Sequence, residues 1–344
     1  MKGKPVRTLL FLLVGGFLCL AVLELFAGVA NYVRRSARTA DNAERPYLND
    51  DDYLRYYFAP NYDGQVQSKP VHINSIGFRG GEPQQRKYRV ACVGDSITFG
   101  WHASGDAGAY PSYLSKELAA LDVDVVNAGL PRSNSMDAFD VYVTRVQQLK
   151  PDVVVIIVGW NDISYQLTAP VEISDPQPIP ADAFSAVQLA RLVLHKLEVR
   201  GSDERVMQER EHAPDKIRWQ YLPVYGQVLR SMVTLMRARG TSPVLVTLPH
   251  YLKKELSLEE KKRMLPHLKS WPNMSYDGWW NAVLRVNDVI REVAAGMDVP
   301  LVECADALES RFFTDICHLD DEGNEVLAKL IAPHVRTVLE GMPR

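Results

Sequence analysis

Residues Tyr88–Ser96 read YRVACVGDS, an apolar run that ends in Gly94-Asp95-Ser96. Short apolar runs bounded by turn residues are typical of strands that are buried on both faces of a parallel sheet. A polar Gly-Asp-Ser directly after such a strand predicts a strand-to-helix turn, which would expose the hydroxyl of Ser96 at the helix N-terminus. A serine that only caps this helix is the simpler interpretation of the same pattern.

Four further runs share the valine-rich character of the first and predict strands: Val123–Asn127, Val153–Val158, Pro243–Leu248 and Val299–Glu303. Helical patterns alternate with them over Tyr110–Ala120, Ser135–Leu149, Tyr221–Arg239, Trp279–Ala295 and Asp321–Leu339. Pro333 is expected to kink the last helix or to end its regular part. Repeated strand–helix units with right-handed crossovers predict a three-layer α/β/α sandwich over residues 87–344.

Two stretches inside this domain are too long for ordinary connections, residues 163–219 and residues 250–278. The first contains a helical pattern over Ala183–Leu197, followed by a charged run. Long insertions in compact domains are commonly lids or binding loops, and a solvated surface elaboration is the alternative for each.

The first forty residues are dominated by an apolar stretch, Leu9–Val33, with basic residues on both sides. About 20 apolar residues suffice for a helix to span a bilayer, so residues 1–40 predict a membrane anchor. A cleavable signal peptide is the alternative, because Gly28-Val29-Ala30 offers small residues at a suitable place, and the protein would then be secreted. In either case we expect the remaining domain outside the cytoplasm. Residues 41–86 are polar and predict a stalk followed by an irregular segment.

Charge and composition exclude several classes of function. Residues 1–40 hold six Lys/Arg and one acidic residue, so residues 41–344 carry a net charge of −8. Such a domain lacks the basic footprint that nucleic-acid binding requires. The chain contains no Cys-x-x-Cys and no His-Glu-x-x-His, and no metal or cofactor is expected. Cys304 and Cys317 are expected to be two buried thiols, with a disulfide as the alternative.

Three more motifs follow Gly94-Asp95-Ser96, each near the end of a predicted strand or the start of a predicted helix: Asn127-Ala128-Gly129, Gly159-Trp160-Asn161-Asp162 and Asp315-Ile316-Cys317-His318. Together they supply the parts of a serine hydrolase. Ser96 is the candidate nucleophile and His318 the base, and a carboxylate three residues earlier, Asp315, can orient that base. Gly129 and Asn161, with the N–H of Ser96, are candidate donors to an oxyanion.

In these four blocks the chain resembles the SGNH (GDSL-type) hydrolases, which are named for a Ser, a Gly, an Asn and a His in four such blocks. The resemblance extends from about Asn74 to the C-terminus, and many membrane-anchored bacterial members carry a stretch similar to Asn74–Gly80 ahead of the first block. It implies a five-stranded, mainly parallel, flavodoxin-like sheet with the site at the carboxyl ends of the strands.

Three further residues have interpretations of their own. Asp162 is expected to be structural and to bond nearby backbone groups. Trp160 fits either a wall of an acyl pocket or core packing. His250, which follows the fourth predicted strand, is expected in a surface or lid position, with a place in the lining of the cleft as the alternative.

The function expected from the sequence is hydrolysis of acyl esters by a Ser–His–Asp mechanism without a cofactor. Short-chain esters, among them O-acetylated carbohydrates of the cell envelope, are the candidate substrates. The first alternative is an O-acetyltransferase that uses the same residues and passes the acyl group to a sugar hydroxyl of an envelope polysaccharide. The second is a non-catalytic scaffold or binding protein of a polysaccharide assembly system, with protein partners that the sequence does not name.

Overall fold

The computed structural model describes residues 47–48, 57–167, 207, 211, 215–270 and 274–342. The predicted membrane segment Leu9–Val33 and the predicted helix Ala183–Leu197 lie outside the described residues. Within the described part of the chain, no helix combines the length and the apolar character needed to cross a membrane. The elements below belong to one compact unit, Pro46–Val171 with Val206–Arg344.

A five-stranded parallel sheet organises this unit. Its strands are β5 (Tyr88–Gly94), β6 (Val123–Gly129), β7 (Val153–Ile157), β8 (Ser242–Val246) and β9 (Leu301–Val302). Their order across the sheet is β6-β5-β7-β8-β9, which is the flavodoxin-like order expected from the sequence. β7 is buried along its whole length, in keeping with a continuous apolar run at the centre of a parallel sheet. The α/β fold class predicted from the sequence is therefore confirmed, and the strand order is the one that the family resemblance implied.

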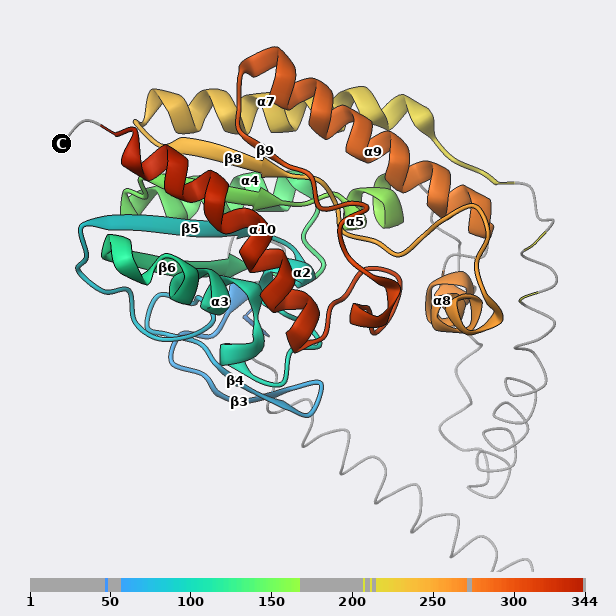
Figure 1. The fold of residues 1–344 in the computed structure, drawn as a ribbon, viewed down its shortest axis with the longest axis horizontal. Coiled ribbons are helices and arrows are strands. Elements are labelled where there is room, and N and C mark those ends of the chain that lie inside the picture. The colour runs from blue at the N-terminus through green and yellow to red at the C-terminus, as the bar shows by residue number, and fades with distance from the viewer. Residues whose placement is uncertain are drawn as a thin grey trace, which may run out of the picture. The chain divides into compact units, whose positions relative to one another are not determined.

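Helices cover both faces of the sheet (Figure 1). On one face α3 (Tyr110–Glu117) packs against α10 (Asp321–Glu340), and on the other α7 (Leu222–Ala238) contacts both α4 (Ser135–Thr144) and α9 (Tyr276–Met297). The apolar residues of α10 recur at helical spacing and bury one stripe, formed by Leu327, Ala328, Ile331, Val335 and Leu339. These three layers are the sandwich predicted from the alternation of strands and helices.

Ahead of the sheet in the sequence lie two short antiparallel pairs of strands. β1 (Tyr47–Leu48) pairs antiparallel with β2 (Tyr57–Phe58), and β3 (Asp63–Val66) pairs antiparallel with β4 (Lys69–His72). The irregular N-terminal segment expected from the sequence therefore contains regular pairs where the structure describes it.

Several predicted element boundaries differ from the structure. α10 continues through Pro333 to Glu340, so of the two effects predicted for this proline, an end to the regular helix is not observed. The proline is exposed, on the side of the helix away from the buried stripe, where water can bond the carbonyl that loses its partner. The predicted helices that begin at Tyr110 and Ser135 end earlier, and each is followed by a separate 3₁₀ turn. The second predicted insertion contains a helix of its own, α8 (Leu258–Ser270).

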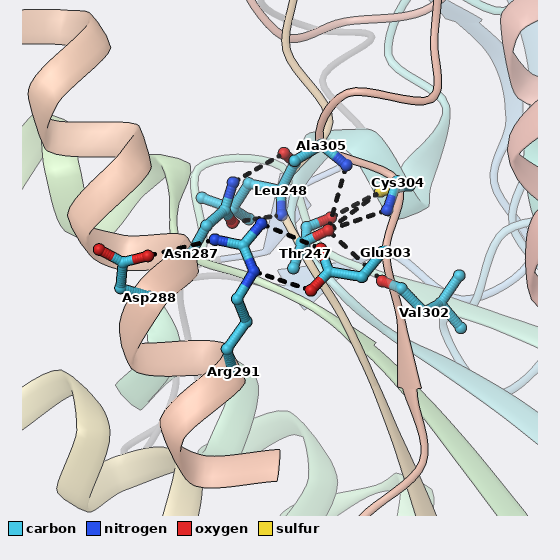
Figure 2. Close-up of polar contacts among 9 residues, drawn as sticks. All are labelled: Thr247, Leu248, Asn287, Asp288, Arg291, Val302, Glu303, Cys304 and Ala305. Carbon is cyan, nitrogen blue, oxygen red and sulfur yellow. Dashed lines mark hydrogen bonds and ion pairs between the residues drawn. The ribbon is translucent and has the colours of Figure 1, made fainter. Parts of the chain in front are cut away.

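A cluster of polar residues joins α9 to the carboxyl ends of β8 and β9, and Figure 2 shows its contacts. The hydroxyl oxygen of Thr247 accepts hydrogen bonds from the backbone N–H groups of Cys304 (2.9 Å) and Ala305 (3.1 Å). The side chain of Asn287 on α9 accepts from the N–H of Leu248 at 2.7 Å and donates back to its carbonyl at 3.3 Å. We call Thr247, Asn287 and Cys304 the β8–α9 cluster. It fixes the loops after β8 and β9 to the helix layer.

The cysteines of the described region are buried free thiols, as the sequence predicted for Cys304 and Cys317. The thiol of Cys304 donates to the carbonyl oxygen of Thr247 at 2.7 Å. Burial raises the pKa of Cys304 to about 12, so this sulfur stays protonated as a donor.

Candidate active site

Ser96 stands at the turn between β5 and the short helix α2 (Ser96–Phe99). The cap of this helix is Asp95, whose Oδ1 accepts from the N–H of Ile97 at 2.9 Å. Asp95 is fully buried, and burial raises its pKa to about 6. Because Asp95 already caps the helix, the simpler interpretation of Ser96 as a capping serine does not hold. As the first residue of α2, Ser96 carries a backbone N–H that the helix itself does not use.

The side chains of Ser96, His318 and Asp315 form one chain of hydrogen bonds. Ser96 Oγ lies 2.7 Å from His318 Nε2, and His318 Nδ1 lies 2.7 Å from Asp315 Oδ2. A carboxylate accepts the Nδ1 proton, which leaves the Nε2 lone pair to accept from the serine hydroxyl. The histidine and aspartate side chains are 13% and 17% exposed, so the cluster is partly shielded and still open to solvent.

The loop that carries Asp315 and His318 is held by its own backbone. The second carboxylate oxygen, Oδ1 of Asp315, accepts from the N–H groups of Cys317 (3.0 Å) and His318 (2.9 Å). Thr314 N–H donates to the carbonyl oxygen of His318 at 2.9 Å, which closes the turn. Asp320 then caps α10 by accepting from the N–H of Gly323 at 2.8 Å. One carboxylate thus shapes the loop with one oxygen and orients the imidazole with the other.

Gly129 lies at the end of β6, beside the nucleophile turn. A Cβ at this position would come within 2.2 Å of the backbone nitrogen of Phe99 in α2, so only glycine allows α2 to pack there. Its own N–H donates to Oδ1 of Asn127 at 3.0 Å. The structure therefore gives Gly129 a packing role, and its N–H already has a partner within the second motif.

Asn161 lies in the short helix α5 (Trp160–Asp162), which begins after Gly159 at φ +149, a conformation that glycine adopts most readily. The side-chain amide of Asn161 donates to the carbonyl oxygen of Ser133 at 3.0 Å. An amide nitrogen carries two hydrogens, so this bond fixes the orientation of the side chain and leaves a second hydrogen for another acceptor.

The neighbours of Asn161 are structural. Asp162 is buried and accepts from the backbone N–H (2.8 Å) and the hydroxyl (2.6 Å) of Ser135 at the start of α4, as expected for a structural carboxylate. Burial raises the pKa of Asp162 to about 7. Trp160 is buried against Trp279, with ring centroids 6.3 Å apart, and donates from its indole nitrogen to the carbonyl of Pro249. Of its two interpretations, core packing is the one observed.

Three residues near this edge were missed or misplaced by sequence reasoning. Arg79, from the Asn74–Gly80 turn, is buried and holds the far end of α2 by donating to the carbonyls of Phe99 and Gly100, each at 2.8 Å. Its Nε pairs with Asp106 at 2.7 Å. His102 lies beside His318, with ring centroids 5.2 Å apart. His250 is buried, and burial lowers its pKa to about 4, so the surface or lid position predicted for it was wrong.

Comparison with known families gives the class of protein that this site and fold define. The model of the GDSL-like lipase/acylhydrolase family matches residues 92–326, and the chain belongs to that family. No curated protein matches the chain.

Solved structures that match this chain include a lipase/acylhydrolase from Enterococcus faecalis, at 17% identity and a TM-score of 0.44, with 75% of this chain and 100% of that one covered. A second is a catalytic mutant of an acetylxylan esterase from Geobacillus stearothermophilus, at 19% identity and a TM-score of 0.43, with 74% of this chain and 96% of that one covered. At these values neither similarity bears on the substrate of this chain.

Proposed function

We propose that this protein is a serine esterase in which Ser96 attacks the carbonyl carbon of a short-chain acyl ester. The observation that carries the proposal is the unbroken chain of two 2.7 Å contacts from Ser96 through His318 to Asp315. Such a chain is what activation of a weak nucleophile by an oriented base requires. A protein that only binds or assembles has no need of this arrangement, which argues against the scaffold alternative.

The proposed mechanism follows from the donor and acceptor pattern. His318 Nε2 takes the hydroxyl proton as Ser96 Oγ bonds to the carbonyl carbon, and the imidazolium is stabilised by Asp315. The proton then passes to the departing alkoxide, which leaves as the alcohol and gives an acyl-enzyme. Water attacks the acyl carbon with His318 as base, which releases the carboxylic acid and restores Ser96.

The oxyanion needs hydrogen-bond donors near Ser96 Oγ. The unused N–H of Ser96 and the second amide hydrogen of Asn161 are the donors that we propose. The N–H of Gly129 stays a prediction for this role, because it would have to be shared with Asn127 Oδ1.

The location and the substrate class that we propose rest on the sequence. The apolar stretch Leu9–Val33 supports attachment of the protein to a membrane with its domain in the periplasm or outside the cell. That location makes O-acetylated carbohydrate our proposed substrate class. A sugar hydroxyl that replaced water as acceptor would convert the same acyl-enzyme into an acetyltransferase.

The test compares the full chain with Ser96→Ala. Each protein is treated with a fluorophosphonate probe and with p-nitrophenyl acetate and butyrate, and Ser231→Ala, which alters a hydroxyl on α7 that bonds only within its helix, is the matched control. We expect labelling and hydrolysis in the wild type and the control, and neither in Ser96→Ala.

Folded wild-type protein that neither labels nor hydrolyses these esters would refute the esterase. Incubation with p-nitrophenyl acetate and a xylo-oligosaccharide acceptor then distinguishes the acetyltransferase from the non-catalytic scaffold. Acetylated sugar formed faster than free acetate would establish the transferase.

A further inference from the structure

A second imidazole faces the carboxylate of the candidate active site. His102 Nε2 lies 3.7 Å from Asp315 Oδ2, the same oxygen that contacts His318 Nδ1 at 2.7 Å. One ligand atom from each of these three residues can be chosen so that all lie within 4.8 Å of one another. The proposed ester hydrolysis uses His318 and Asp315 and leaves His102 without a role.

Two imidazole nitrogens and one carboxylate oxygen are a donor set that suits zinc, whereas magnesium and calcium prefer oxygen ligands alone. Three protein ligands with an open fourth position are the usual arrangement for a zinc ion that retains a water. The side chain of His102 is 33% exposed, so an ion can reach the group from solvent. Coordination through Oδ2 would leave Asp315 Oδ1 on the backbone N–H groups that shape the loop.

We propose that His102, Asp315 and His318 bind a zinc ion, and that the bound ion switches off Ser96. The second half of this statement rests on the proposed esterase function. It follows from the position of the proton on the imidazole ring of His318. In the free site the ring proton is on Nδ1, facing Asp315, and the Nε2 lone pair faces Ser96.

Zinc binds Nδ1 through the lone pair of that nitrogen, so the Nδ1 proton must leave to solvent. The ring stays neutral by taking up one proton from solvent on Nε2. Nε2–H is a donor and no longer accepts the serine proton. Ser96 then keeps its proton and is a poor nucleophile. Removal of the ion restores the active tautomer, so the inhibition is reversible.

The first experiment measures binding without reference to activity. Equilibrium dialysis with Zn²⁺, and the visible absorption of Co²⁺ as a substitute ion, are applied to the full chain, to Ser96→Ala and to His102→Ala and His102→Gln. His334→Ala, a histidine on α10, is the matched control. Substitution of a group that hydrogen-bonds to a metal ligand lowers metal affinity about 10–100-fold. Loss of the ligand His102 itself should therefore weaken zinc binding by at least that factor.

Wild type, Ser96→Ala and His334→Ala should each bind zinc at this site, and both His102 variants should lose that binding. Equal zinc binding by wild type and the two His102 variants would overturn the proposal.

The second experiment measures fluorophosphonate labelling of Ser96 with and without Zn²⁺, with each variant compared with its own metal-free rate. We expect zinc to slow labelling of the wild type, EDTA to restore it, and His102→Gln to need about tenfold more zinc or higher. Zinc that binds at His102 without slowing the label would refute the switch. If the wild type fails to label even without metal, the esterase proposal fails, and dialysis alone still decides whether the site exists.

Discussion

Two polar clusters lie at the carboxyl ends of the same sheet, and they differ in burial and in the groups that they bond. In the β8–α9 cluster, Thr247, Asn287 and Cys304 are fully buried and bond to backbone groups of neighbouring loops. In the other cluster, Ser96, His318 and Asp315 are partly exposed and bond to one another.

The difference separates structure from chemistry. A buried polar group must be satisfied by the protein, because an unpaired group costs about 1–3 kcal/mol. A partly exposed group can form a hydrogen bond within the protein that a hydrogen bond to a substrate later replaces. We therefore expect changes in the Ser96 cluster to alter rate and changes in the β8–α9 cluster to alter stability.

The largest effect on rate, after loss of Ser96 itself, is expected from Asp315→Asn. An amide that presents N–H to His318 Nδ1 would favour the imidazole tautomer with its proton on Nε2, facing Ser96. The corresponding change in serine proteases lowers turnover by about 10⁴-fold, and we expect a similar loss here. Steady-state hydrolysis of p-nitrophenyl acetate measures it, with circular dichroism to verify the fold. Turnover within a few-fold of the wild type would mean that Asp315 only shapes the loop.

Asn161→Ala sharpens the comparison, because Asn161 both bonds to the protein and is proposed to bond to the oxyanion. Loss of one oxyanion donor typically lowers turnover by about 10²–10³-fold. Loss of the bond to Ser133 O alone would cost stability and leave the turnover of the folded protein unchanged. Turnover and urea unfolding are therefore measured on the same preparation. An unaltered rate together with lower stability would assign Asn161 to the scaffold.

The fold and most of the candidate site were predictable because their signals are local. Valine runs such as Tyr88–Val93 specify buried strands, and the carboxyl ends of parallel strands meet at one edge, which brings Ser96 toward the loop at His318. The i, i+3 spacing of Asp315 and His318 predicted their contact, which is confirmed at 2.7 Å.

What the sequence did not predict depends on contacts between distant segments. Arg79 reaches α2 across about twenty residues of chain, and His102 meets Asp315 across more than two hundred. An arginine in a polar turn and a histidine after a helix give no local sign of either contact. His250 was expected in a surface or lid position after the fourth predicted strand, but packing around the end of β8 buries it. The polar β8–α9 cluster likewise carries no sequence motif.

Asp162→Asn tests a buried carboxylate that belongs to neither cluster and bonds to Ser135. Burial raises the pKa of Asp162 from 3.8 to about 7, so the folded protein holds a proton that the unfolded chain releases near pH 4. The free energy of unfolding should therefore fall as pH rises from about 4 to about 7, by roughly 1.4 kcal/mol for each unit of pKa difference at most, and level off above pH 7.

The difference between wild type and Asp162→Asn in urea unfolding at several pH values isolates this contribution. Exposed Asp277 on α9, changed to Asn, is the control for loss of one carboxylate. Parallel pH profiles for the wild type and Asp162→Asn would show that Asp162 is ionised in the folded protein across this range, held by its two bonds from Ser135.

Thr247→Val is the smallest change and the most direct test of the β8–α9 cluster. Valine keeps the shape of threonine but removes the hydroxyl, which leaves the N–H groups of Cys304 and Ala305 without their acceptor. We expect a loss of about 1–3 kcal/mol in the free energy of unfolding and an unchanged rate per folded molecule. Thr234→Val on α7 removes only a hydroxyl that bonds its own helix at Arg230, and it should cost less. A loss of rate that exceeded the loss of folded protein would show that the loops after β8 and β9 position the Ser96 cluster, and the division between structure and chemistry would not hold.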